Sequence, residues 1–237
     1  MKIGPYSIIG KNVELGDDCY IGNNVTITGN TTIGKKCKIF HSSSIGEIPQ
    51  DLKFDGEKTK TIIGDNTTIR EFVTINKGTN QLGKTELGSN VLLMASTHIA
   101  HDCIVGDNVV LSNLATLGGH VEIGDWAILG GGVLVHQFTK IGEHSLIGGG
   151  FRAVQDVPPY ILAADHPLRF IGVNIVGLKR RGIDKEDRRL IKEAYKIFFR
   201  SGLNRKTALE KIKLDFPETK VIQNILQFMN HSERGII

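Results

Sequence analysis

The sequence predicts a mainly β fold of short strands joined by tight turns, followed by a small α-helical domain. Three observations predict it. Ile, Leu or Val recurs at every sixth position from Ile3 to Ile147, with two interruptions. Gly often stands at the next position, and the fifth residue of each hexad is mostly small or β-branched. After Asp184 the apolar residues instead recur in steps of three and four, which is the period of an amphipathic helix.

A period of six excludes one long helix and a simple amphipathic strand, whose periods are 3.6 and 2. It fits short β segments in which residues one and five of each hexad face inward. Two polar stretches, residues 47–60 and 80–86, interrupt the repeat and predict inserted loops, which commonly carry function. The prolines of "QDVPPY" stop regular strand pairing. We therefore expect a repeat domain over residues 1–160 and a linker with an α-helical domain over residues 161–237.

The apolar spacing from Leu190 to Phe198 predicts one helix of the second domain. Residues 205–214 and 218–229 fit two further helices. These helices would cover the open end of the repeat domain, which would otherwise expose unpaired backbone.

Composition limits the function classes. The net charge of +4 is too small to indicate nucleic acid, but it suits an acidic or phosphorylated partner. We expect no signal peptide and, without a run of about 18 apolar residues, no integral membrane protein. The three cysteines, Cys19, Cys37 and Cys103, all occupy the inward fifth position. They indicate core thiols in a reducing compartment, and we expect a cytoplasmic protein.

The hexads resemble those of the hexapeptide-repeat acyltransferases. This resemblance implies a left-handed parallel β-helix, in which three hexads make one triangular coil and 18 residues return to the same edge. The handedness comes from the family alone, because general rules favour right-handed crossovers. Stacked coils would lie about 4.8 Å apart, like strands of a parallel sheet.

The stretch "HIAHDC" places titratable side chains at one corner of such a coil. His101 is the third residue of its hexad and points outward, and Asp102 follows it. One coil further lies Gly119 beside His120, and two coils further Gln137 beside His136, so we expect His101, His120 and His136 to line one outer edge. Histidine suits general-base work, a neighbouring carboxylate can set its tautomer, and a glycine N–H can stabilise an oxyanion.

Two other interpretations of these histidines remain. A metal site requires ligands that converge within about 2.0–2.1 Å of one ion, and three outward histidines in a row converge poorly. Histidines scattered over the surface without a function would show similar spacing. We therefore favour acid–base or binding work, without a metal.

Eight motifs make the resemblance more specific: "IPQDLKF", "IREFVTI", "HIAHDCIVG", "GGHVEIGD", "VHQF", "QDVPPY", "GVN" and "GLKRRG" occur in this order. Together they resemble the family of acyl-[acyl-carrier-protein]–UDP-N-acetylglucosamine O-acyltransferases of lipid A synthesis, over essentially the whole chain. The resemblance implies acyl transfer from acyl carrier protein to the sugar 3-position of UDP-N-acetylglucosamine. We expect the acyl group to be 3-hydroxylated. The family is a homotrimer with sites between subunits and uses no cofactor or metal.

The resemblance also implies roles for single residues. His101 matches the general base, Asp102 the carboxylate beside it, and Gly119 the backbone donor to the oxyanion. Gly149 matches a position that limits acyl-chain length. The matches to substrate-binding positions are Gln50, Asp51 and Lys53 of the first loop, His98, His120, His136 and Gln137 in the groove, and Asn174, Arg180 and Arg181 near the uridine and phosphates.

Two positions depart from the family pattern, and three rival functions remain. Val176 stands where the family often has an acidic residue, and Pro167 where a histidine near the acyl tail is found. One rival is the same chemistry on a 3-amino sugar nucleotide, which nothing in the sequence separates from the hydroxyl acceptor. Another is a small-acyl-CoA transferase, against which "IPQDLKF" and the helical tail argue. The third is a non-enzymatic scaffold that binds a partner along the same edge.

Overall fold

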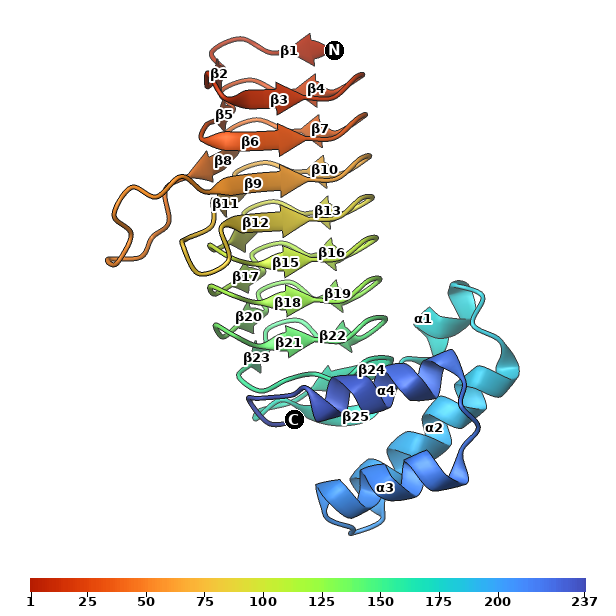
Figure 1. Cartoon of the computed structure of the whole chain (residues 1–237). Helices are drawn as coiled ribbons and strands as arrows, with labels where there is room; N and C mark the ends of the chain where they lie inside the picture. Colours follow the sequence, from red (N-terminus) through yellow and green to blue (C-terminus); the bar gives the residue numbers. More distant parts are fainter.

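The computed structural model describes residues 1–237, and its larger part is a parallel β-helix with three sheets (Figure 1). Sheet A contains β1 (Lys2–Ile3), β4 (Tyr20–Ile21), β7 (Lys38–Ile39), β10 (Thr68–Ile69), β13 (Leu92–Leu93), β16 (Val110–Leu111), β19 (Ile128–Leu129), β22 (Leu146–Ile147), β24 (Ile161–Ala164) and β25 (Arg169–Val173). Sheet B contains β2 (Ile8–Ile9), β5 (Thr26–Ile27), β8 (Ser44–Glu47), β11 (Thr74–Asn76), β14 (His98–Ile99), β17 (Thr116–Leu117), β20 (Leu134–Val135) and β23 (Arg152–Ala153). Sheet C contains β3 (Val13–Leu15), β6 (Asn30–Ile33), β9 (Lys60–Ile63), β12 (Lys84–Leu87), β15 (Ile104–Val105), β18 (Glu122–Ile123) and β21 (Lys140–Ile141).

The 18-residue coil sets the register of the sheets. Leu93 pairs with Leu111, and Leu111 pairs with Leu129. The chain visits sheets A, B and C in turn, so each coil has three corners, which we call the A–B, B–C and C–A corners. Residues that are 18 apart in an uninterrupted run therefore lie over one another at the same corner.

The inward positions form one aliphatic core along the β-helix. Val25 and Ile27, at positions five and one of their hexads, are both fully buried. The predicted inward thiols are also buried and free of disulfides. Burial raises the pKa of Cys37 to about 11 and that of Cys103 to about 12. These two thiols are therefore protonated at neutral pH.

The turns place the fourth residue of most hexads in the left-handed backbone region. Asn66, Asn90 and Asn108 have φ between 56° and 58°, a conformation that asparagine tolerates. Larger side chains such as Trp126 and Phe138 occupy the same slot elsewhere. For a bulky residue this conformation is uncommon, so these positions are of interest for their side chains.

Both insertions interrupt the β-helix between sheets B and C. The first lies between β8 and β9. Its two predicted end residues belong to strands, because Glu47 ends β8 and Lys60 begins β9. The second lies between β11 and β12 and spans residues 77–83. The prediction of a loop over residues 80–86 therefore extends too far, because β12 already begins at Lys84. Thr85 fills an inward slot, is fully buried and pairs with Thr61.

The end of the β-helix differs from a simple stop at residue 160. β24 continues sheet A by pairing parallel with β22, and β25 then turns back antiparallel to β24. β24 therefore still stacks on the coils, and the expected boundary at residue 160 falls one strand before the β-helix ends. The antiparallel strand β25 was not predicted from the sequence.

Four helices follow: α1 (Ile175–Arg180), α2 (Lys185–Arg200), α3 (Arg205–Asp215) and α4 (Lys220–Asn230). They gather at the end of the β-helix away from the N-terminus (Figure 1). Asn174, Asp184 and Asn204 cap the first three helices, because each side chain accepts a hydrogen bond from an N–H of the first turn. None of the helices combines the length and the apolarity that a membrane span requires.

Candidate active site

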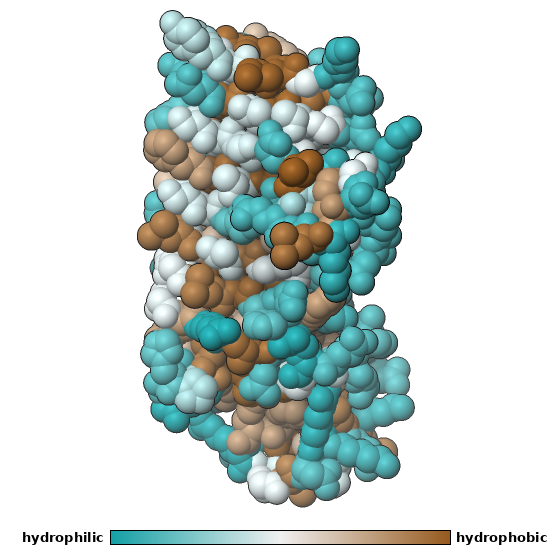
Figure 2. All heavy atoms as spheres, turned by 90° about the vertical axis from the view of Figure 1, so that its left-hand side faces the viewer, coloured by the Kyte–Doolittle hydropathy of each residue, from teal (hydrophilic) through white to brown (hydrophobic).

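The B–C corner gathers most of the predicted site residues. Both insertions leave the β-helix here, and His101, Gly119 and Gln137 follow successive strands of sheet B at this corner. A cavity of about 680 Å³ lies between the two insertions and these coils. Its side of the molecule mixes hydrophilic and hydrophobic groups (Figure 2). The predicted residues among its lining are Gln50, Asp51, Lys53, His101, His120 and Gln137.

The centre of this cavity is a histidine–carboxylate pair. His101 Nδ1 lies 2.9 Å from Asp102 Oδ2, and the Asp102 side chain has no exposed area. The Thr79 N–H donates to Asp102 Oδ1 at 2.9 Å, and the Thr79 hydroxyl donates to Oδ2 at 2.6 Å. An ionised carboxylate can only accept hydrogen bonds, so His101 Nδ1 carries a hydrogen and donates it to Asp102. The other ring nitrogen, Nε2, is then left as a free base.

Thr79 is a site residue that the sequence reasoning missed. It is 7% exposed and stands one residue before the predicted second loop. The insertion holds Thr79 tightly, because a Cβ at Gly78 would lie 2.4 Å from the backbone of Lys84. Thr85 adds a third contact, since its hydroxyl accepts the N–H of Asp102 at 2.9 Å. The second insertion thus supports the buried carboxylate, and a threonine beside a loop carries no sequence signal for this role.

Gly119 lies directly against the His101 ring. A Cβ at Gly119 would lie 2.6 Å from His101 Cε1 and 2.7 Å from Nε2, so only glycine fits beside this ring. The Gly119 N–H makes no hydrogen bond within the chain. A free base and an unpaired backbone donor are thus adjacent, which suits proton removal with stabilisation of an oxyanion.

His120 packs beside the pair. Its ring centroid is 5.1 Å from that of His101, and its Nε2 is 3.6 Å from Asp102 Oδ2. Phe138, one coil further at the same corner, stacks on His120 at 4.5 Å. Burial is the main cause that lowers the pKa of His120, against an opposing effect of Asp102. His120 is therefore neutral at pH 7 where it lines the cavity. Phe138, which lines the same cavity, is a second residue that the sequence reasoning missed.

The expected edge of three histidines is only partly formed. His136 follows β20 directly, and the register places it over Gly118 instead of over His120. Its Nδ1 lies 3.1 Å from the carbonyl oxygen of Gln137. His98 lies on β14, where its Nδ1 is 2.7 Å from Thr74 Oγ1, and burial lowers its pKa. Neither residue lines the cavity, because a shift of one or two residues along a coil changes the direction of a side chain.

The remaining predicted residues lie at the other two corners. Asn174 donates from Nδ2 to the carbonyl oxygen of His144 at the C–A corner, over 3.0 Å. Arg181 contacts the same histidine, and Arg180 precedes it at the end of α1. Gly149 lies at the A–B corner, where a Cβ would be 3.1 Å from the Gly131 oxygen. One chain therefore does not bring these residues to the His101 cavity.

His101, Asp102 and His120 also offer three metal-ligand atoms within 4.8 Å of one another. A metal at this position would have to displace the proton between His101 Nδ1 and Asp102. It would also compete with the two bonds from Thr79 to the carboxylate. The hydrogen bonds therefore fit an acid–base pair better than a set of metal ligands.

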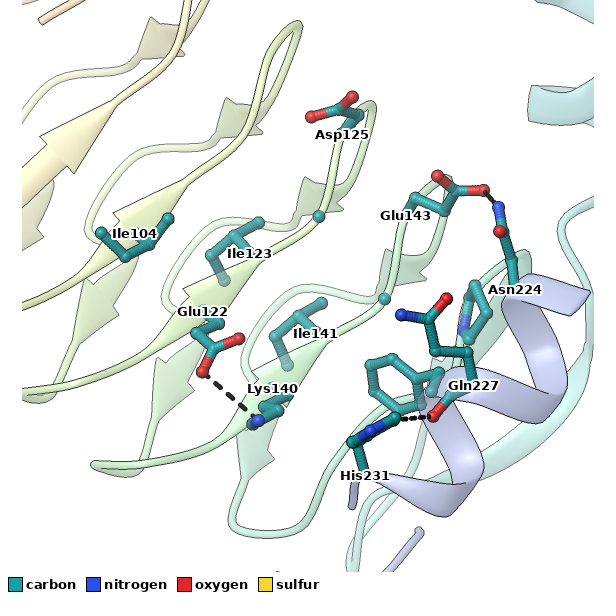
Figure 3. A pocket seen from close by; sticks show the side chains of 14 residues that line it. Ile104, Glu122, Ile123, Asp125, Lys140, Ile141, Glu143, Asn224, Gln227 and His231 are labelled. Atoms are coloured by element: carbon teal, nitrogen blue, oxygen red, sulfur yellow. Dashed lines mark hydrogen bonds and ion pairs between the residues drawn. The ribbon is translucent and has the colours of Figure 1, made fainter. Parts of the chain in front are cut away.

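A second cavity, of about 520 Å³, lies between sheet C and α4 (Figure 3). Lys140 pairs with Glu122 across 3.4 Å, and Asn224 donates to Glu143 at 2.6 Å. His231 points to a backbone oxygen of its own helix, not to a carboxylate. This cavity therefore lacks a histidine–carboxylate pair like that of His101 and Asp102.

Comparisons with known proteins agree with the fold and the motifs. Residues 156–237 match the model of domain 2 of UDP N-acetylglucosamine O-acyltransferase, and residues 2–29 and 84–119 match that of the bacterial transferase hexapeptide, six repeats. An acyl-[acyl-carrier-protein]–UDP-N-acetylglucosamine O-acyltransferase of Thermodesulfovibrio yellowstonii is 46% identical over 235 residues, 99% of this chain and 91% of that protein.

Solved structures give the same result. UDP-N-acetylglucosamine O-acyltransferase of Moraxella catarrhalis is 42% identical, with a TM-score of 0.95 over 99% of this chain and 92% of that one. The acyltransferase of Bacteroides fragilis is 39% identical, with a TM-score of 0.93 over 98% of both chains. These similarities confirm the expected left-handed parallel β-helix of hexapeptide repeats.

Proposed function

Since the chain belongs to the UDP-N-acetylglucosamine O-acyltransferase family, we propose that it transfers a fatty acyl group from acyl carrier protein to the 3-position of UDP-N-acetylglucosamine. This reaction is the first step of lipid A biosynthesis. The observation that carries the proposal is the free Nε2 of His101 beside the unpaired N–H of Gly119. Neither a small-acyl-CoA transferase nor a scaffold is favoured by the relatives, which bear the name of the acyl-carrier-protein enzyme.

In the proposed reaction His101 Nε2 removes the proton of the sugar 3-hydroxyl while that oxygen attacks the thioester carbonyl. The Gly119 N–H stabilises the negative charge on the carbonyl oxygen of the tetrahedral intermediate. The intermediate then expels the carrier thiolate, which receives from His101 the proton that the sugar hydroxyl gave up. Asp102 fixes the tautomer and stabilises the imidazolium between the two steps. No covalent enzyme intermediate, metal or cofactor is required, because the thioester itself is activated.

We propose that the working enzyme is a homotrimer whose sites lie between subunits. Gln50, Asp51 and Lys53 would bind the sugar nucleotide from the B–C corner of one copy, together with His120 and Gln137 of the same cavity. His98 and His136, which do not line the cavity of one chain, would complete the groove between two copies. Asn174, Arg180 and Arg181 would approach from the C–A corner of another copy, because one chain holds them apart from His101. Light scattering should give three times the 26.0 kDa of one chain; the mass of one chain would contradict a shared site.

The other expected properties follow from the same reaction. Gly149 would leave room for a long acyl chain, and a 3-hydroxyacyl group is our expected donor. The basic end of α1, with Lys179 and Arg180, would attract the acidic carrier protein and the pyrophosphate. Nucleic acid is not a proposed partner, and we propose the cytoplasm as the compartment.

Mass spectrometry of the products tests the reaction. Purified protein is supplied with a mixture of acyl and 3-hydroxyacyl carrier proteins, acetyl-CoA, UDP-N-acetylglucosamine and its 3-amino analogue. We expect an ester of UDP-N-acetylglucosamine with a long acyl group. An amide product alone, an acetylated product alone or no product would each refute the proposal. His101→Ala should form the same oligomer with almost no turnover, and full activity in that variant would refute the base assignment.

A further inference from the structure

Three large rings stack on one another at the C–A corner. Trp126 and His144 lie parallel, with centroids 6.2 Å apart and planes at 7°, and Tyr160 continues the stack at 5.8 Å. All three residues have positive φ, between 56° and 67°. Asn108 occupies the same slot one coil before Trp126. Bulky residues rarely adopt this conformation, and two of these side chains, Trp126 and His144, make a contact that asparagine would not supply.

That contact is with Arg181, the residue at the C-terminal end of α1. Its guanidinium carbon is 5.3 Å from the centroid of the Trp126 ring. Its Nη1 donates to His144 Nδ1 at 3.4 Å, and burial lowers the pKa of His144, so this nitrogen is free to accept. The guanidinium is thus held by a ring face and a neutral imidazole.

No carboxylate of the chain pairs with Arg181. Burial lowers the pKa of Arg181, and it has no partner within ion-pair distance. Asp125 Oδ1 accepts the backbone N–H of Asp107 at 2.8 Å. Glu143 accepts from the Tyr160 hydroxyl and from the Asn224 amide. A half-buried cation whose neighbouring carboxylates have other partners is available to an incoming anion.

The stack also fixes the helix that carries Arg181. The His144 carbonyl accepts a bond from Asn174 Nδ2, and Asn174 Oδ1 caps α1 through the N–H of Gly177 at 3.1 Å. Both ends of α1 are therefore attached to one corner residue of the β-helix. The position of Arg181 is defined before any ligand arrives.

We propose that Trp126 and His144 are positioning residues, which hold the Arg181 guanidinium in place for a phosphate of the sugar-nucleotide substrate. This rests on the proposed function, because it takes the anion to be the pyrophosphate of that substrate. Trp126 supplies the surface on which the guanidinium lies. His144 supplies the acceptor that fixes its rotation.

Calorimetric titration with UDP-N-acetylglucosamine tests the proposal without any acyl transfer. Trp126→Leu should weaken binding about three- to tenfold, within the range of cation–π contacts, whereas Trp126→Phe should retain most of the affinity. KM for the sugar nucleotide should rise by the same factor, with kcat within about twofold of wild type. Phe72→Leu, at the same backbone slot of the A–B corner, is the matched control and should bind normally.

A double variant separates positioning from folding. In an Arg181→Ala background, Trp126→Leu should cause no further loss of affinity, because the group that Trp126 holds is gone. An equal loss in both backgrounds would overturn the proposal, as would unchanged affinity in Arg181→Ala or Trp126→Leu alone. If wild type binds the sugar nucleotide and shows these differences but forms no product, the proposed reaction fails and the positioning role stands.

Discussion

Asp102→Asn changes one atom of the buried carboxylate and nothing of its shape. The native carboxylate accepts three bonds, two from Thr79 and one from His101 Nδ1. An amide has only one acceptor oxygen. To keep the bond from the Thr79 N–H, this oxygen must remain at the Oδ1 position, so the amide NH2 faces His101 Nδ1. Nδ1 must then accept, and the proton moves to Nε2, where it blocks the base.

We expect kcat to fall about a thousand- to ten-thousandfold, as when the triad aspartate of a serine protease is changed to asparagine. That loss corresponds to about 4–5.5 kcal/mol of activation free energy. The stability cost is smaller. The Thr79 hydroxyl can reverse and accept from the new NH2, so the main loss is of charge in the hydrogen bonds, about 1.5–3 kcal/mol.

The assay is kcat with acyl carrier protein and UDP-N-acetylglucosamine, alongside thermal unfolding. Asp107→Asn is the matched control, because Asp107 Oδ1 accepts one N–H from Ser89 at 2.6 Å and an amide oxygen can replace it. The control should keep its activity. A folded Asp102→Asn variant with more than a tenth of the wild-type kcat would refute the tautomer argument.

Three further predictions concern the same molecule. Gly119→Ala should fold but lose most of its activity, because the new Cβ would displace the His101 ring; unchanged kcat would contradict the packing. Burial lowers the pKa of His98 and His120 in the folded chain, so the unfolded chain takes up protons at higher pH. The melting temperature should therefore fall as the pH drops below about 6.5, less so in His98→Gln, and a constant value from pH 7 to 5 would argue against this. The Cys103 thiol, with a pKa of about 12, should react with a thiol reagent only after unfolding, and rapid labelling of the native protein would contradict its burial.

The fold was predictable because the hexads specify it locally. A repeated inward Ile with a small fifth residue fixes which side chains face the core, coil after coil. The loop over residues 80–86 was predicted too long because Lys84 and Glu86 are polar, although Thr85 between them is buried and paired. The polar composition of this stretch did not predict that β12 begins at Lys84.

The site was less predictable, because it depends on which direction each corner residue points. The register correctly placed Gly119 over His101, one coil apart. His136 does not line the cavity of one chain, because the register sets it over Gly118 and sets its neighbour Gln137 over Gly119. Thr79 was missed because its two bonds to Asp102 join residues 23 positions apart, and no local pattern announces such a contact.

The register has a consequence for how the length of this protein can change. Each lap of 18 residues pairs only with the laps before and after it. Loss of one residue within a lap would turn the following inward side chains outward, whereas gain or loss of a whole lap would preserve every inward position. Relatives of different length should therefore differ in the β-helix by multiples of 18, or in segments that loop out at a corner.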